Sequence, residues 1–134
     1  MVKLTIRIDL SPTVAVGPGK VQLLESIEET GSISAAGRTM NMSYRRAWLL
    51  VDELNKLFKE RVATTAHGGR TGGGAKLTPF GRKLVRHYRA LEAKAHAATA
   101  AHLAELEAAL HQRAPRAAKR RPIVSRRQSS RPTP

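Results

Sequence analysis

Helix-end signals divide residues 20–58 into three short helical segments, and this spacing constrains the fold more than any other feature of the chain. Apolar periodicity predicts a first helix over residues 20–29, which Gly31 suits as a C-terminal cap. Ser32 is placed as the N-cap of a second helix that runs to about Met40. After a tight turn at residues 41–42, Ser43 caps a third helix over residues 44–58. The sequence therefore predicts a helix-turn-helix arrangement.

Short strands are expected on either side of these helices. Residues 3–9 alternate apolar and polar side chains, which predicts a half-buried strand, and residues 11–19 are expected to form a loop. Residues 62–66 and 75–78 flank a glycine-rich stretch, which predicts a β-hairpin. A hairpin directly after the third helix distinguishes a winged helix from a plain helix-turn-helix. The fold class expected is therefore α+β.

A long last helix is expected from Thr78 as N-cap and Pro79 as its first residue to about residue 112. Apolar positions on this helix recur at steps of four and three, and small side chains among them permit close approach of a second helix. They predict a homodimer interface, although a solvated stalk is the alternative. The expected interface residues are Leu84, Tyr88, Leu91, Ala95 and Ala98.

The chain is strongly basic, with a net charge of +14 and a pI near 11.4. A field of this size attracts nucleic acid or an anionic membrane surface. No stretch is long and apolar enough for a spanning helix, and residues 1–12 do not resemble a signal peptide, so no membrane association is expected. The absence of cysteine excludes disulfides and cysteine zinc fingers and favours a cytoplasmic protein.

The charge is concentrated at the C-terminus. Residues 112–134 contain eight Lys and Arg, four Pro and no acid. A segment of this composition is expected to be a disordered basic tail. The expected organisation is a winged helix-turn-helix domain over residues 1–78, a dimerisation helix over residues 79–111, and the tail over residues 112–134.

Two stretches resemble the molybdate-dependent transcriptional regulators of the ModE type. One is the segment 31–36, Gly-Ser-Ile-Ser-Ala-Ala, together with Ser-Tyr-Arg-Arg-Ala-Trp at 43–48; the other is the glycine-rich segment 68–75 with the following Leu77-Thr78. The helix-turn-helix alone also resembles that of LysR-type regulators. The resemblance implies DNA binding, and dimerisation through helices outside the DNA-binding domain. Such regulators carry a C-terminal molybdate-binding region that this chain is not expected to contain, so no small-molecule ligand domain is expected.

The candidate DNA contacts lie in the first turn of the third helix and in the hairpin. Arginine bonds guanine in the major groove, a helix N-terminus favours phosphate, and a glycine-rich loop with a guanidinium fits a narrow minor groove. The alternatives are a simple cap, a solvated face and a mobile turn. Trp48 is expected in the core or at its boundary rather than on DNA. The expected DNA-binding residues are Ser43, Tyr44, Arg45, Arg46, His67, Arg70 and Lys76.

No catalytic, metal or cofactor site is expected. The five histidines form no HExxH motif and no i,i+4 pair, and the acids are explained by ion pairs on helices. The hypothesis that follows is a homodimeric transcriptional regulator that binds double-stranded DNA at a two-fold-related operator. An architectural, nucleoid-type protein with little sequence preference is the main alternative. An adaptor whose winged helix binds another protein is a third.

Overall fold

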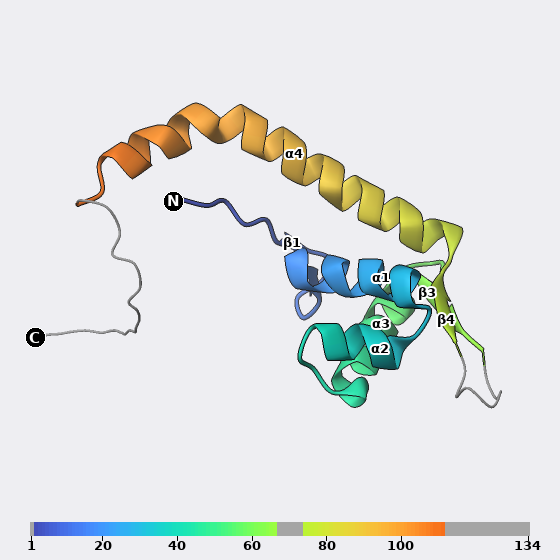
Figure 1. Ribbon diagram of the computed structural model, residues 1–134. Coiled ribbons are helices and arrows are strands. Elements are labelled where there is room, and N and C mark those ends of the chain that lie inside the picture. The colour runs from blue at the N-terminus through green and yellow to red at the C-terminus, as the bar shows by residue number, and fades with distance from the viewer. Residues whose placement is uncertain (1, 67–73, 112–134) are drawn as a thin grey trace, which may run out of the picture. The chain divides into compact units, whose positions relative to one another are not determined.

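The structure, a computed structural model, describes residues 2–66 and 74–111. Within these residues the fold is α+β, as expected, with four helices and two antiparallel pairs of strands (Figure 1). The chain forms two compact units, one of residues 5–97 and one that joins residues 2–4 to residues 98–111. In chain order the elements are β1 (Ile8–Asp9), β2 (Ala15–Val16), α1 (Pro18–Thr30), α2 (Ile33–Thr39), α3 (Tyr44–Leu57), β3 (Ala63–Thr65), β4 (Ala75–Leu77) and α4 (Pro79–Ala108).

The first strand is shorter than expected, and it pairs with a strand that the sequence analysis missed. Side chains alternate between partly buried and exposed over residues 2–10, but only β1 is paired. Its partner β2 lies within the segment expected to be a loop, with Ile8 opposite Val16. The backbone N–H groups of Leu10 and Ser11 donate to the Val14 carbonyl at 2.9 and 3.1 Å, so the chain turns back on itself there. A two-residue strand after this turn is too short to show a period of two.

The helix boundaries follow the capping residues that the sequence indicated. Gly31 ends α1 in the left-handed conformation, with φ of 74°. The Ser32 side chain accepts a hydrogen bond from the Ala35 backbone N–H at 3.0 Å, and Ser43 accepts one from Arg46 at 3.1 Å. Each cap of this kind stabilises a helix by about 1 kcal/mol. Local side-chain chemistry therefore sets where α2 and α3 begin.

A close approach between α2 and α3 fixes the turn between them. The turn contains Asn41 at a positive φ of 56°, and the backbone N–H of Met42 donates to the Gly37 carbonyl at 2.9 Å. A Cβ atom on Gly37 would lie 3.1 Å from the Met42 carbonyl oxygen and 3.3 Å from the Ala47 Cβ. The absence of a side chain at residue 37 therefore lets the two helices pack closely.

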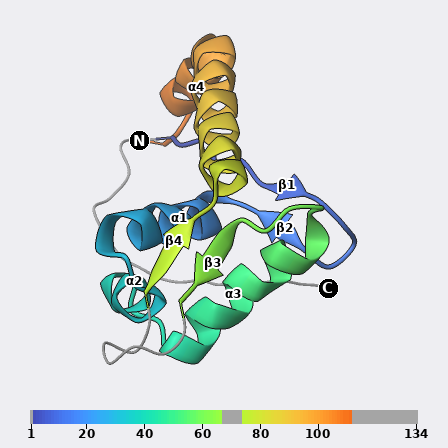
Figure 2. The same cartoon turned by 90° about the vertical axis from the view of Figure 1, so that its right-hand side faces the viewer.

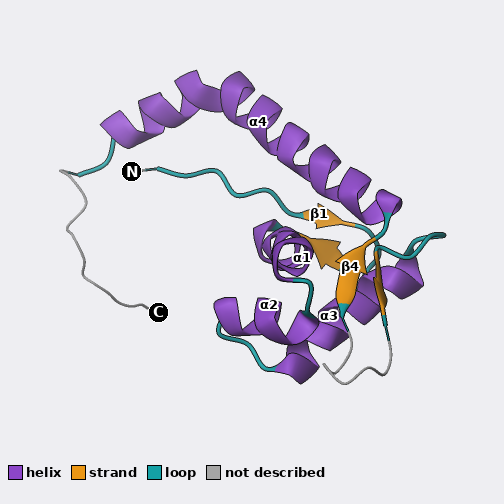
Figure 3. Ribbon diagram, turned by 45° about the vertical axis from the view of Figure 1, so that its right-hand side comes forward, coloured by secondary structure: helices purple, strands orange, loops and turns teal. Residues whose placement is uncertain are grey.

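The core is almost entirely aliphatic, and it lies between the helices and the short strands of residues 5–97 (Figures 2 and 3). Helices α1 and α3 supply about half of its buried side chains, and Tyr88 is its one fully buried aromatic residue within the described part of the chain. The buried side chains of α3 are Ala47, Val51 and Leu54, so the opposite side of that helix faces solvent. Helix α1 lies between α2 and the first part of α4 in both views (Figures 1 and 2).

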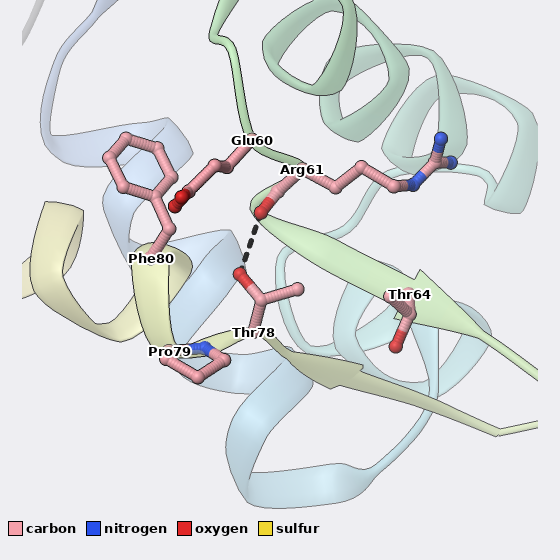
Figure 4. A pocket seen from close by; sticks show the side chains of 6 residues that line it. All are labelled: Glu60, Arg61, Thr64, Thr78, Pro79 and Phe80. Atoms are coloured by element: carbon pink, nitrogen blue, oxygen red, sulfur yellow. Dashed lines mark hydrogen bonds between the residues drawn. The ribbon is translucent and has the colours of Figure 1, made fainter.

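Helix α4 follows the strand pair without a linker. Thr78 accepts a hydrogen bond from the Gly81 backbone N–H at 2.9 Å, as expected of an N-cap, and donates to the Arg61 carbonyl at 2.6 Å (Figure 4). A Cβ on Gly81 would lie 2.0 Å from the Val62 carbonyl oxygen, so only glycine fits. The helix ends at Ala108, a turn earlier than expected.

Candidate nucleic-acid interface

The first turn of α3 presents two arginines without partners. Ser43 caps the helix, and the side chains of Tyr44, Arg45 and Arg46 are exposed. Within residues 2–66 and 74–111, neither arginine side chain makes an ion pair or a hydrogen bond. The first turn also contains no acid. The start of α3 therefore combines two free guanidinium groups with the positive end of the helix dipole.

Acids near this helix are neutralised farther along it. Asp52 forms an ion pair with Lys56, one turn on, at 3.0 Å, and Glu53 accepts a hydrogen bond from Lys20 of the adjoining α1 at 3.3 Å. No acid occurs between residues 44 and 51. All charged side chains in the N-terminal half of α3 are therefore cationic, whereas the acids in its C-terminal half are paired with lysines.

The β3–β4 pair lies beside the end of α1. The backbone N–H of Ala75 donates to the Gly31 carbonyl at 2.8 Å, which ties β4 to the junction of α1 and α2. Thr64 and Lys76 face each other across the pair with exposed side chains, while Ala63 and Ala75 point into the core. Lys76 is thus available to a polyanion. His67 and Arg70, the other expected contacts of this hairpin, lie outside the described residues.

The expected dimer face divides into a buried and an exposed part. Tyr88 is only 1% exposed, and its hydroxyl donates to the Ile6 carbonyl at 2.8 Å, so this residue is a core residue of its own chain rather than an interface residue. Leu84 also packs partly against the core. Leu91 is 49% exposed, Ala98 is exposed, and Ala95 is partly buried. The sequence analysis assigned the whole apolar face of this helix to contact with a second chain. The first turns of that face instead pack against the core of the same chain.

A network of ion pairs joins α1 to α4, and the sequence analysis did not foresee it. Arg89 contacts Glu25 through two hydrogen bonds, at 2.8 and 3.1 Å, and Glu92 through a third at 2.7 Å. The hydrogen bonds from Glu25 and Glu92 raise the pKa of Arg89 above its ordinary value. Two turns before Arg89 in α4, the Nε atom of Arg82 lies 3.6 Å from a carboxylate oxygen of Glu28. These contacts orient the first part of α4 on α1.

Two exposed apolar residues of α3 were also missed. Trp48 is 41% exposed and Leu49 is 43% exposed, so of the two positions expected for Trp48 the core is excluded and the boundary of the core is not. The signal was in the periodicity, because residues at helical spacing from Ala47 and Val51 face the core and Leu49 falls between them on the far side. The sequence analysis used this periodicity only to find the core.

Within residues 5–97 the chain is a small α+β unit that carries one cationic helix end beside an antiparallel strand pair. None of the helices in the described ranges is long and apolar enough to cross a membrane. In the same ranges no cluster of three or more His, Asp or Glu side chains could hold a metal ion.

No protein-family model matches the chain. It is 41% identical over 85 residues to the molybdenum transport protein ModE of Azotobacter vinelandii, a match that covers 63% of this chain and 32% of that protein. It is 50% identical over 78 residues to the molybdenum-pterin-binding protein MopB of Rhodobacter capsulatus, covering 58% and 29%. The DNA-binding transcriptional dual regulator ModE of Escherichia coli (strain K12) is 33% identical over 86 residues, covering 64% and 33%.

The resemblance to ModE-type regulators is thereby confirmed over about three fifths of the chain. The chain spans about a third of the length of these relatives.

Proposed function

We propose that this chain is a transcriptional regulator that binds double-stranded DNA through a winged helix-turn-helix, with α3 as the recognition helix and the β3–β4 hairpin as the wing. The observation that carries the proposal is the pair of free arginines at the start of α3. An arginine there can donate two hydrogen bonds to a guanine in the major groove, and the helix N-terminus favours a phosphate. Relatives that are named transcriptional regulators support the same reading.

Each proposed contact has a distinct role. Arg45 lies on the side of α3 opposite the buried residues Ala47, Val51 and Leu54, and it is the residue best placed to bond a base edge. Ser43, Tyr44 and Arg46 flank it and would contact the DNA backbone. Lys76 would contact phosphate from the hairpin, and His67 and Arg70 complete the proposed wing.

The test compares Arg45→Ala and Arg46→Ala on two duplexes. One duplex is selected by the wild-type chain from a random library, and the other has unrelated sequence. Removing a base contact should weaken binding to the selected duplex by about 5- to 150-fold, equivalent to about 1–3 kcal/mol, with a much smaller effect on the unrelated duplex. Arg86→Ala, which removes the same charge from an exposed site on α4, is the matched control. Equal losses on both duplexes would show that the two arginines contact only phosphate.

We further propose that the chain acts as a homodimer on a two-fold-related site, with Leu91, Ala95 and Ala98 of α4 between the two copies. Leu91 supports this because a leucine at 49% exposure lies on the same face of α4 as the core residue Tyr88. Binding two half-sites at once raises affinity through effective concentration.

The positive charge of residues 112–134 favours a second candidate, an architectural DNA-binding protein with little sequence preference. Cationic side chains release counterions from DNA. A plot of the logarithm of the binding constant against the logarithm of the salt concentration therefore has a slope of about −0.9 for each phosphate neutralised. Truncation after Leu110 should therefore reduce the salt dependence of binding. If the truncated chain still prefers the selected duplex, sequence reading resides in the folded part and the architectural function is excluded. If the salt dependence is unchanged, these residues do not contact DNA.

A further inference from the structure

An apolar strip lies on the solvent side of α3, next to the free arginines. Its members are Tyr44, Trp48 and Leu49, which are 56%, 41% and 43% exposed. Within the described residues the other exposed large apolar side chains are Leu91 and Leu106 of α4 and Leu110, which follows that helix. Tyr44 and Trp48 are four residues apart and are therefore neighbours on the helix, whereas Leu49 follows Trp48 directly and points about 100° around the helix from it.

The strip shares its surface with Arg45. Trp48 and Leu49 lie three and four residues after Arg45, so each is a neighbour of Arg45 and the arginine lies between them on the helix surface. Four residues of α-helix rise by about 6 Å, and successive base pairs of B-DNA are about 3.4 Å apart. When α3 lies along the major groove with Arg45 at a base edge, Leu49 therefore lies about two base-pair steps away.

The charges around the strip favour a polyanion as its partner. Arg45 and Arg46 are free, and no acid occurs before Asp52, which is paired with Lys56. The apolar group that a major groove offers is the C5-methyl of thymine. We propose that Trp48 and Leu49 read thymine methyl groups about two base pairs from the base that Arg45 bonds. This inference rests on the proposed DNA-binding function and assigns the strip a part of its sequence specificity.

The experiment removes the methyl group from the DNA and the side chain from the protein. The wild-type chain first selects a duplex from a random library, and each thymine of that duplex is then replaced singly by deoxyuridine, which lacks only the methyl. At the contacted position, wild-type affinity should fall about fourfold, as expected for one buried methyl group. Leu49→Ala should bind the thymine duplex several-fold more weakly and should lose its sensitivity to deoxyuridine at that position.

Leu106→Ala is the matched control, because this leucine is 60% exposed but lies on α4. It should retain the full deoxyuridine effect. Thermal unfolding of each variant checks that the fold is intact, and Trp48→Phe, which retains an apolar ring, gives an independent measure of the strip.

Three results would overturn the inference while leaving the proposed function standing. These are a selected duplex without thymine at the expected distance, a wild-type chain indifferent to every deoxyuridine, and a Leu49→Ala chain that keeps its sensitivity to all of them. A change in sedimentation of Leu49→Ala, with the deoxyuridine effect preserved, would assign the strip to a protein interface instead. A wild-type chain that selects no duplex would overturn the proposed function itself.

Discussion

Tyr88 connects α4 to the N-terminal segment through one partly buried hydrogen bond, from its hydroxyl to the Ile6 carbonyl at 2.8 Å. Tyr88→Phe keeps the ring and removes the bond, and it leaves a carbonyl without its partner. We expect the free energy of unfolding to fall by about 1 kcal/mol, measured by urea denaturation. An unchanged value would mean that water replaces the hydroxyl at no cost.

Tyr88 should also make the stability of the fold depend on pH in the alkaline range. Burial raises the pKa of Tyr88, the Glu92 carboxylate raises it further, and Arg89 lowers it. The unfolded chain, with a tyrosine pKa of about 10, therefore loses this proton at lower pH than the folded chain. Stability due to Tyr88 should be complete below about pH 10 and should decline as pH rises through the higher folded pKa. Urea denaturation across this range should show a steeper alkaline loss for wild type than for Tyr88→Phe, which has no hydroxyl to titrate.

Gly81 is a second residue at which a single atom matters. An alanine Cβ there would lie 2.0 Å from the carbonyl oxygen and 2.9 Å from the carbonyl carbon of Val62, and a backbone neighbour moves less readily than a side chain. We expect Gly81→Ala to destabilise the fold by about 3 kcal/mol, by overpacking. Gly19→Ala is the control, since nothing lies within 4 Å of its Cβ, and it should stabilise α1 by about 0.5 kcal/mol. Equal thermal shifts for the two variants would contradict the clash.

Among the elements, the contact between α1 and α4 depends on the ion pairs of Arg89. This residue holds Glu25 through two parallel hydrogen bonds at 2.8 and 3.1 Å, a geometry stronger than a single contact. The pair is about 40% exposed, so solvent screens it, and we expect Arg89→Met to cost about 1 kcal/mol at low salt and less at high salt. Arg7→Met breaks the more exposed pair with Asp9 and should cost almost nothing. Identical losses, independent of salt, would assign the role of Arg89 to packing.

Sequence reasoning was accurate where a serine or glycine cap decides a helix end, but it began the first helix at residue 20, whereas the proline at the first helical position begins α1 at Pro18. Ser32, Ser43 and Gly31 act within a few residues of themselves, so the limits of α2 and α3 could be predicted from them. The placement of Arg45 and Arg46 on an exposed first turn followed from the same cap.

The features that were missed depend on segments distant in the chain. Strand β2 exists because β1 pairs with it, and its two residues carry no pattern of their own. Tyr88 is buried because Ile6, 82 positions earlier, lies against it. An apolar period on a helix indicates that the face is covered, but it does not indicate whether the cover comes from the same chain or from another.

For the whole molecule, the proposed homodimer makes Leu91 the decisive residue. A charge on this exposed face should prevent association without disturbing the core, because Leu91 is 49% exposed. We expect Leu91→Glu to sediment as a monomer and to bind the selected duplex at least tenfold more weakly, through the loss of two-site binding. Ala93→Glu places the same charge on the other side of α4 and should remain dimeric.

Two results would contradict this expectation in different ways. A Leu91→Glu chain that stays dimeric would show that the interface lies elsewhere. A monomer that binds the selected duplex with wild-type affinity would refute the two-fold arrangement.

The ion pairs between α1 and α4 also have a kinetic consequence. Arginines of α4 form ion pairs with Glu25, Glu28 and Glu92. By contrast, Arg45 and Arg46 at the start of α3 are exposed and unpaired within the described residues. Arg45 and Arg46 therefore place unopposed positive charge at the start of α3, and such charge attracts a polyanion before contact. This attraction should speed diffusional encounter, so added salt should slow association with DNA more than it speeds dissociation.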